Sequence, residues 1–376
     1  MLVISVIMAA FSVFGAVDLI IGNRIGIGKE FERGMKMFGE LALSMIGMIV
    51  LAPLIAHLLN PALKAVAGVI PLDPSIVFST VFANDMGGAK LALETAADPS
   101  LAYYNGLVVA SMMGATVSFT LPFVLSAVQK EQHKGLLLGL MCGICTIPVG
   151  CFVSGFIAGV RFVTLVIDLV PLLLFSALLS FGLLKFPNAS VKVFHVFGVF
   201  IKILVTVGLA IGIFEALTGW DIVPYTAPIW EGAQIVFNVA VVETGAFPLV
   251  FLLSKALKKP LKKLGDKTGI NETSAVGFLS TLATSVTTFG MMKDMDDKGV
   301  VLNSAFAVSA AFTFADHLAF TMSFNSAYVL PMIVGKLLSG VAALLLAILM
   351  YKRMMKKKPI MPLEQPKTDE PQTEIV

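Results

Sequence analysis

Long apolar runs recur along the whole chain and constrain its fold more than any other feature. A helix needs about 20 such residues to cross the hydrocarbon core of a bilayer. Hydrophobic residues make up 57 % of the chain and charged residues 14 %, outside the range of soluble domains. This excludes a soluble enzyme, a nucleic-acid-binding protein and a secreted disulfide scaffold, and it predicts an all-α polytopic membrane protein. The apolar segments cover residues 2–21, 37–59, 75–97, 101–128, 135–160, 162–184, 193–217, 229–253, 272–292, 299–324 and 327–350.

Two of these segments are too polar to face lipid. Residues 75–97 hold Asn84, Asp85 and Lys90 around a Gly-Gly pair, and residues 272–292 carry a ladder of serines and threonines. Polar side chains and irregular backbone at membrane depth occur where protein or a cavity surrounds them. We therefore expect both segments inside the bundle.

The basic loops fix the orientation of the segments, because cytoplasmic loops carry the excess of Lys and Arg. Six basic stretches fall on one side of the membrane only if segments 75–97 and 272–292 each return to the face they entered from. These stretches are 24–36, 130–134, 185–192, 255–267, 293–298 and 352–358. The chain is thus expected to have about nine spanning helices and two opposed re-entrant hairpins. Its N-terminus would lie outside and its C-terminus in the cytoplasm, in a bacterial inner membrane.

This topology divides the chain into five elements, one linking helix and five elements of opposite orientation. The 5+1+5 inverted repeat would comprise residues 1–161 with a hairpin near 75–97, a linking helix at 162–192, and residues 193–351 with a hairpin near 272–292. Asn105-x5-Ser111 recurs as Asn303-x5-Ser309 at matching positions. Inverted repeats are typical of secondary transporters, whose binding site lies near the midplane. Residues 352–376, rich in Pro, Glu and Lys, are expected to be a disordered cytoplasmic tail.

Several sequence blocks resemble one known family. They are Asn84-Asp85-Met86-Gly87-Gly88, Ser111-Met112-Met113-Gly114, Thr146-Ile147-Pro148-Val149-Gly150 and Asp316-His317-Leu318-Ala319. With them, nearly the whole chain resembles the EutH family of ethanolamine transporters. The resemblance implies a permease that admits ethanolamine, through the bacterial cytoplasmic membrane, to a utilisation pathway. One departure is Ala89, where the resemblance leads us to expect Tyr after Asp-Met-Gly-Gly.

Ethanolamine carries one ammonium and one hydroxyl group, so its site needs acidic and polar side chains. Asp85, beside Asn84, is the first candidate, because burying a charge at mid-bilayer costs roughly 2.5–3.5 kcal/mol without a compensating role. Asp316 and His317 form a second pair that could bind a cation or move a proton, and Glu243 is a third acid. The structural alternatives are an Asp85–Lys90 ion pair, an aspartate that fixes a core imidazole, and a helix-to-helix hydrogen bond.

Further polar residues lie on the two helices that the repeat matches. They would bind the substrate hydroxyl or a coupling ion, or join helices by hydrogen bonds of about 1 kcal/mol; they are Asn105, Ser111, Thr116, Asn303 and Ser309. Asp168, Lys202 and Lys336 are isolated charges within spans, and the two lysines are expected to reach the membrane surface by snorkelling. The three cysteines lie in one apolar run and are expected to pack between helices, so no metal or cofactor is predicted.

The sequence favours a carrier that exposes a midplane site alternately to the two sides of the membrane. A sodium- or proton-coupled carrier of another small solute and a channel-like facilitator are the alternatives. An intramembrane enzyme is disfavoured, because the spans hold no His-Glu-x-x-His motif and no Ser–Lys dyad. The partners are ethanolamine and the lipid bilayer, with no nucleic acid. A coupling ion, either a proton or sodium, and a homo-oligomer are compatible with these helices.

Overall fold

The structure is a computed structural model that describes residues 2–68 and 72–357. Every regular element in these two stretches is a helix. The long helices are α1 (Leu2–Ile20), α2 (Ile27–Ala67), α7 (His133–Ile157), α8 (Phe162–Lys185), α9 (Pro187–Thr218), α10 (Ile229–Thr268) and α15 (Val329–Lys357). The shorter α-helices are α3 (Ser75–Val81), α4 (Ala89–Thr95), α5 (Pro99–Tyr104), α6 (Leu121–Ala127), α11 (Glu272–Ala283), α12 (Ser285–Gly290), α13 (Asp297–Ala310) and α14 (Asp316–Asn325). Short π-helical or 3₁₀ segments join them: η1 (Asn84–Gly88), η2 (Asn105–Gly114), η3 (Thr116–Thr120), η4 (Lys130–Gln132), η5 (Met292–Asp294) and η6 (Ser326–Tyr328).

Eight helical stretches in the described residues are long and apolar enough to cross a membrane, which confirms the predicted all-α polytopic class. They are α1, α2, the run from α5 to α6, α7, α8, α9, α10 and the run from α14 to α15. The two segments predicted to form hairpins, 75–97 and 272–292, are each broken into short helices and are not among the eight. Their re-entrant course and the inverted repeat stay predictions.

The prediction of one continuous span over residues 299–324 is wrong. Helix α13 ends at Ala310, and α14 begins only at Asp316. Between them, the backbone N–H groups of Phe312 and Phe314 bond to the end of α11 instead of continuing the helix. The count of about nine spans is therefore one higher than the eight candidate spans of the described residues.

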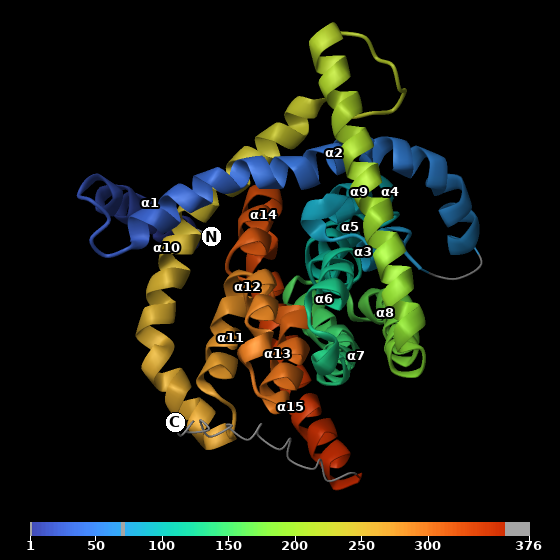
Figure 1. The fold of residues 1–376 in the computed structure, drawn as a ribbon. Helices are drawn as coiled ribbons and strands as arrows, with labels where there is room; N and C mark the ends of the chain where they lie inside the picture. Colours follow the sequence, from blue (N-terminus) through green and yellow to red (C-terminus); the bar gives the residue numbers. More distant parts are fainter. Residues whose placement is uncertain (1, 69–71, 358–376) are drawn as a thin grey trace, which may run out of the picture.

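Two helix pairs make the most extensive packing contacts, α2 along α10 and α7 along α15. Figure 1 shows α2 and α10 as long, bent helices, with α11 next to α10 and α13 near α15. Each bent helix contains two prolines, Pro53 and Pro61 in α2 and Pro248 and Pro260 in α10, and proline removes a backbone hydrogen bond and kinks a helix. Helix α8, which covers most of the predicted linking segment, packs on α7, and α9 packs along α2.

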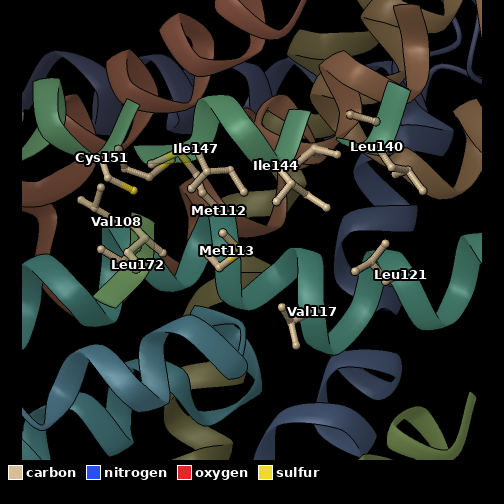
Figure 2. Close-up of a cluster of buried hydrophobic side chains, with 14 of the residues drawn as sticks. Val108, Met112, Met113, Val117, Leu121, Leu140, Ile144, Ile147, Cys151 and Leu172 are labelled. Atoms are coloured by element: carbon tan, nitrogen blue, oxygen red, sulfur yellow. The ribbon is translucent and has the colours of Figure 1, made fainter. Parts of the chain in front are cut away.

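An apolar core joins the run from η2 to α6 to the facing helix α7 (Figure 2). Val108 and Met112 lie near Cys151, whereas Leu121 lies nearer Leu140, so the two elements run antiparallel. All five side chains are fully buried. This close packing holds η2 in place, and the first broken segment packs against η2 through α3, η1 and α4.

Helix α15 continues beyond the apolar segment to Lys357. Residues 352–357 of the predicted tail are thus helical. The remainder of that prediction, residues 358–376, lies outside the described residues.

Candidate functional site

The first broken segment places Asp85 at an unwound tip between two short helices. After α3, Phe82 and Ala83 take extended backbone angles, and within η1 Gly87 has a φ of +92°. A side chain at that φ would be strained, and a Cβ on Gly87 would also lie 3.0 Å from Met48. The Gly-Gly pair thus allows the turn that presents Asp85, whose buried Oδ1 atom has no hydrogen-bond partner.

The second unwound tip lies between α13 and α14. Phe312 has a φ of +61°, a left-handed conformation that costs a residue other than glycine roughly 1–3 kcal/mol. Backbone hydrogen bonds hold it there: the N–H of Phe312 donates to Thr281 O (3.1 Å), and that of Phe314 donates to Leu282 O (2.9 Å). Asp316 and His317 consequently form the first turn of α14, where the helix dipole favours a negative charge.

Both tips face a cavity of about 440 Å³, within the usual range for small-molecule sites. Helix α2 forms one wall, and the two unwound tips, α12 and the η2–η3 run form the others. The cavity runs from the exposed side chains of Arg33 and Glu40 to the buried His317. Its lining residues are Arg33, Met37, Glu40, Leu41, Ser44, Ala83, Asp85, Met86, Ala115, Phe119, Thr284, Val286, Thr287, Phe312, Asp316 and His317.

Three carboxyl groups, those of Asp85, Asp316 and Glu243, gather in and beside this cavity. Asp85 experiences repulsion from Asp316 and attraction from Lys336. Glu243 is fully buried on α10 and lies beside Asp316, close enough for the two carboxyl groups to share a hydrogen bond. Among the described residues, none of these three carboxyl groups has a lysine or arginine within ion-pair distance.

Lys336 is fully buried behind the cavity wall, so the expectation that it snorkels to the membrane surface is wrong. Its Nζ donates to the carbonyl oxygen of Ser111 (2.6 Å) and to Nδ1 of His317 (2.9 Å). Because a lysine ammonium only donates, Nδ1 of His317 accepts in this contact, and its ring proton lies on Nε2. Lys336 thereby joins α15, η2 and α14 at the cavity.

Of the residues proposed from sequence, Asp85, Asp316 and His317 line the cavity. Asn84 and Glu243 are buried and outside the lining, and neither atom of the Asn84 amide has a hydrogen-bond partner. The remaining five candidates make hydrogen bonds within the bundle: Asn105 to Ser75 and Asp168, Ser111 to Val108 O, Thr116 to Met112 O and Val308 O, Asn303 to Ser274 O and Gly299 O, and Ser309 to Ser339.

The alternative ion pair between Asp85 and Lys90 does not form. Lys90 pairs with Glu94 (3.2 Å) and with Glu231 of α10 (2.7 Å). Ala89, where the family resemblance led us to expect Tyr, is buried against Gly106 and does not line the cavity. The departure therefore lies outside the cavity lining.

Sequence reasoning missed several residues that shape the site. Arg33 and Glu40 were interpreted as part of a basic loop and an apolar span, although both line the cavity at the start of α2. An aromatic wall also went unnoticed: the rings of Phe119 and Phe312 lie 5.6 Å apart, and those of Phe312 and His317 lie 5.3 Å apart. The helical spacing of the sequence could have indicated that Lys336 is buried. It lies four residues after Met332, so the two side chains share the buried face of α15.

Comparison with known families gives a match to "Ethanolamine utilisation protein, EutH" over residues 2–350. The chain belongs to the EutH family. This confirms the resemblance drawn from the Asn-Asp-Met-Gly-Gly and Ser-Met-Met-Gly blocks, and it covers all of the eight candidate spans except the end of α15.

Three curated relatives show how far the similarity extends. A protein of Listeria monocytogenes named "Probable ethanolamine permease EutH" is 44 % identical over 94 % of this chain and 95 % of its own length. One of Salmonella typhimurium with the same name is 36 % identical over 93 % of this chain and 95 % of its own length. The Bacillus subtilis protein YxeR, named as uncharacterized, is 37 % identical over 90 % of this chain and 91 % of its own length. No solved structure matches the chain significantly.

Proposed function

We propose that the protein is a permease that carries ethanolamine across a bacterial cytoplasmic membrane, and that it is not an enzyme. The permease names of its relatives support this function. The structural observation that carries the proposal is the cavity between two unwound helix tips, whose carboxyl groups form no ion pair with any residue that the structure describes. A small cation is the ligand that would compensate the charge of such buried carboxyl groups.

The cavity offers a partner for each end of ethanolamine. The ammonium group would lie between Asp85 and Asp316, with Phe119 and Phe312 close enough for cation–π attraction. The hydroxyl group would pair with Thr287, one of the two threonines in the lining. Ethanolamine is much smaller than the cavity, so water would share the space in this conformation.

The conformation fits a carrier that is open to the cytoplasm. The cavity reaches the surface at Arg33 and Glu40, next to the basic stretch 24–36 that the charge pattern assigns to the cytoplasm. Alternating access then requires a second state, in which α2 closes this mouth and the site opens to the other side.

Two matched contacts support the inverted repeat within this proposal. Asn105 donates its amide to Oγ of Ser75, at the start of the first broken segment. Asn303 donates its amide to the carbonyl oxygen of Ser274, in the first turn of the second one. The same residue type thus anchors both broken segments at matching places in the two halves.

The test of the proposed function is uptake of labelled ethanolamine into proteoliposomes. Asp85→Asn is expected to lower saturable uptake at least tenfold, because a hydrogen bond to a charged group contributes roughly 1.5–3 kcal/mol. Asp221→Asn, an exposed aspartate in the loop before α10, is the matched control and should leave uptake unchanged. Absence of saturable uptake by the wild-type protein would contradict ethanolamine as substrate.

Cysteine labelling tests the orientation. Lys64 near the end of α2 and Lys259 on α10 both have exposed side chains. In a protein whose native cysteines are replaced, a cysteine at position 64 should react with an impermeant reagent added outside cells. A cysteine at position 259 should react only after the membrane is opened. The reverse pattern at either position would overturn the assigned orientation and the repeat.

A further inference from the structure

A second buried polar group lies away from the cavity, where the linking helix α8 meets the first broken segment. Asp168, on α8, is 1 % exposed, and Asn105, at the start of η2, is fully buried. The amide nitrogen of Asn105 donates to Oδ1 of Asp168 (3.3 Å) and to Oγ of Ser75 (2.9 Å). Neither Asp168 nor Asn105 lines the cavity.

This group has more acceptors than donors. Both hydrogens of the Asn105 amide nitrogen are used, and the hydroxyl of Ser75 donates to Oδ1 of Asp73 (2.5 Å). Oδ2 of Asp168 and Oδ1 of Asn105 are buried and have no hydrogen-bond partner. An unpaired buried acceptor costs about 1–3 kcal/mol. One added hydrogen on Asp168 would supply the donor that the group lacks.

Acidic residues also lie near this group. Asp73 and Asp98 are close enough to Asp168 to repel an ionised carboxyl group. The other ionisable neighbours are Tyr104, whose hydroxyl donates to the carbonyl oxygen of Cys151 (2.8 Å), and Cys151 itself on α7. In the part of the chain that the structure describes, no lysine or arginine forms an ion pair with Asp168.

Asp18 shows what a buried aspartate looks like in this protein when its charge is compensated. It is also 1 % exposed, but its two oxygens accept hydrogen bonds from the backbone N–H groups of Ile25, Gly26 and Gly28. Three donors stabilise an ionised carboxyl group, whereas Asp168 has one long contact with an amide. The two aspartates therefore differ in the number of hydrogen-bond donors that reach them.

We propose that Asp168 and Asn105 form a proton-binding site, separate from the ethanolamine cavity, that is occupied while the first broken segment is docked on α8. Loss of the proton leaves an uncompensated carboxylate between α8 and the Asn105–Ser75 contact, which favours undocking of α3. Asp85 follows α3 on the same broken segment, so proton binding is linked to the position of a cavity residue. This link rests on the proposed transport function, whereas the proton site itself does not.

Infrared spectroscopy of the purified protein tests the proton site without any transport. At neutral pH, the wild-type protein should show a carbonyl stretching band of a protonated carboxylic acid that is lost in Asp168→Asn. Asp18→Asn, the matched control, should lose no such band. Asn105→Ala should shift the band, which keeps the test decisive if Asp168→Asn does not fold. Identical bands in the wild type and in both Asp168→Asn and Asn105→Ala would overturn the proposal.

Transport by the same variants tests the link to the cavity. In proteoliposomes, Asp168→Asn should keep ethanolamine exchange at equal pH but lose the stimulation of net uptake by an imposed pH gradient. Stimulation that persists in the variant, or that a sodium gradient produces instead, would overturn the link. Absence of exchange by the wild-type protein would contradict the proposed function, while the infrared result would still decide the proton site.

Discussion

Replacing Lys336 by methionine is expected to have a large effect on both stability and transport. The ammonium group of Lys336 donates to the carbonyl oxygen of Ser111 and to His317, and methionine offers no donor. Leaving these two buried acceptors unpaired should lower the free energy of unfolding by roughly 2–6 kcal/mol. Ethanolamine uptake by the protein that still folds should fall at least tenfold, because His317 loses the contact that fixes its ring at the cavity wall. Thermal unfolding in detergent and proteoliposome uptake measure the two effects.

Lys202→Met is the matched control for this substitution. Lys202 is also within a membrane-spanning helix, α9, but its side chain is exposed. Its replacement should change the free energy of unfolding by less than about 0.5 kcal/mol. Wild-type stability and uptake in Lys336→Met would show that the buried lysine has no part in the site.

Replacing Gly114 by alanine should displace the first unwound tip. A Cβ atom at this position would lie 2.0 Å from the carbonyl oxygen of Phe82 and 2.7 Å from that of Ser79. Both are backbone atoms, which cannot move aside as a flexible side chain can. The overpacking should cost about 1–3 kcal/mol of stability. It should also weaken ethanolamine binding to the folded protein, because Asp85 lies three residues after Phe82.

Gly290→Ala provides the comparison, since a Cβ atom there would meet nothing within 4 Å. Unfolding and equilibrium binding of labelled ethanolamine should both match the wild type in this control. If Gly114→Ala also matches the wild type in both measurements, the docking of the first broken segment against η2 is not required for the site.

Hydropathy and loop charge were sufficient to predict the class of the fold, because the length of an apolar run is a direct requirement of the bilayer. They also singled out the two polar segments, 75–97 and 272–292, which the structure divides into short helices, whereas the predicted re-entrant course of these segments stays a prediction. The break at residues 311–315 was missed for a physical reason. That stretch contains no Pro or Gly, and its conformation depends on hydrogen bonds from Phe312 and Phe314 to a segment some thirty residues earlier. The helix propensities of residues 311–315 do not indicate a hydrogen bond to a segment so distant in the sequence.

The site was predictable where a charge occurs in an apolar sequence and less so elsewhere. Asp85, Asp316 and His317 stood out as ionisable groups within spans, and all three line the cavity. The polar residues of the matched helices were equally visible in the sequence, but whether an amide such as that of Asn105 faces a cavity or a neighbouring helix depends on packing angles. The place of Arg33 in the cavity lining was missed because a charged residue in the first turns of a long helix has the sequence pattern of a loop residue.

The two hydrogen bonds between the end of α11 and the stretch 311–315 have a mechanical consequence. They join the end of α11 to the stretch before α14, so the positions of Thr281 and Phe312 are coupled. Phe312 and Asp316 line the cavity from one side of this joint, and Thr284 lines it from the other. A solute bound between Thr284 and Asp316 would add a further contact between the two segments and restrict their relative motion. Part of the binding free energy would then offset the conformational entropy that is lost when motion between α11 and α14 is restricted. Neither helix would need to change internally.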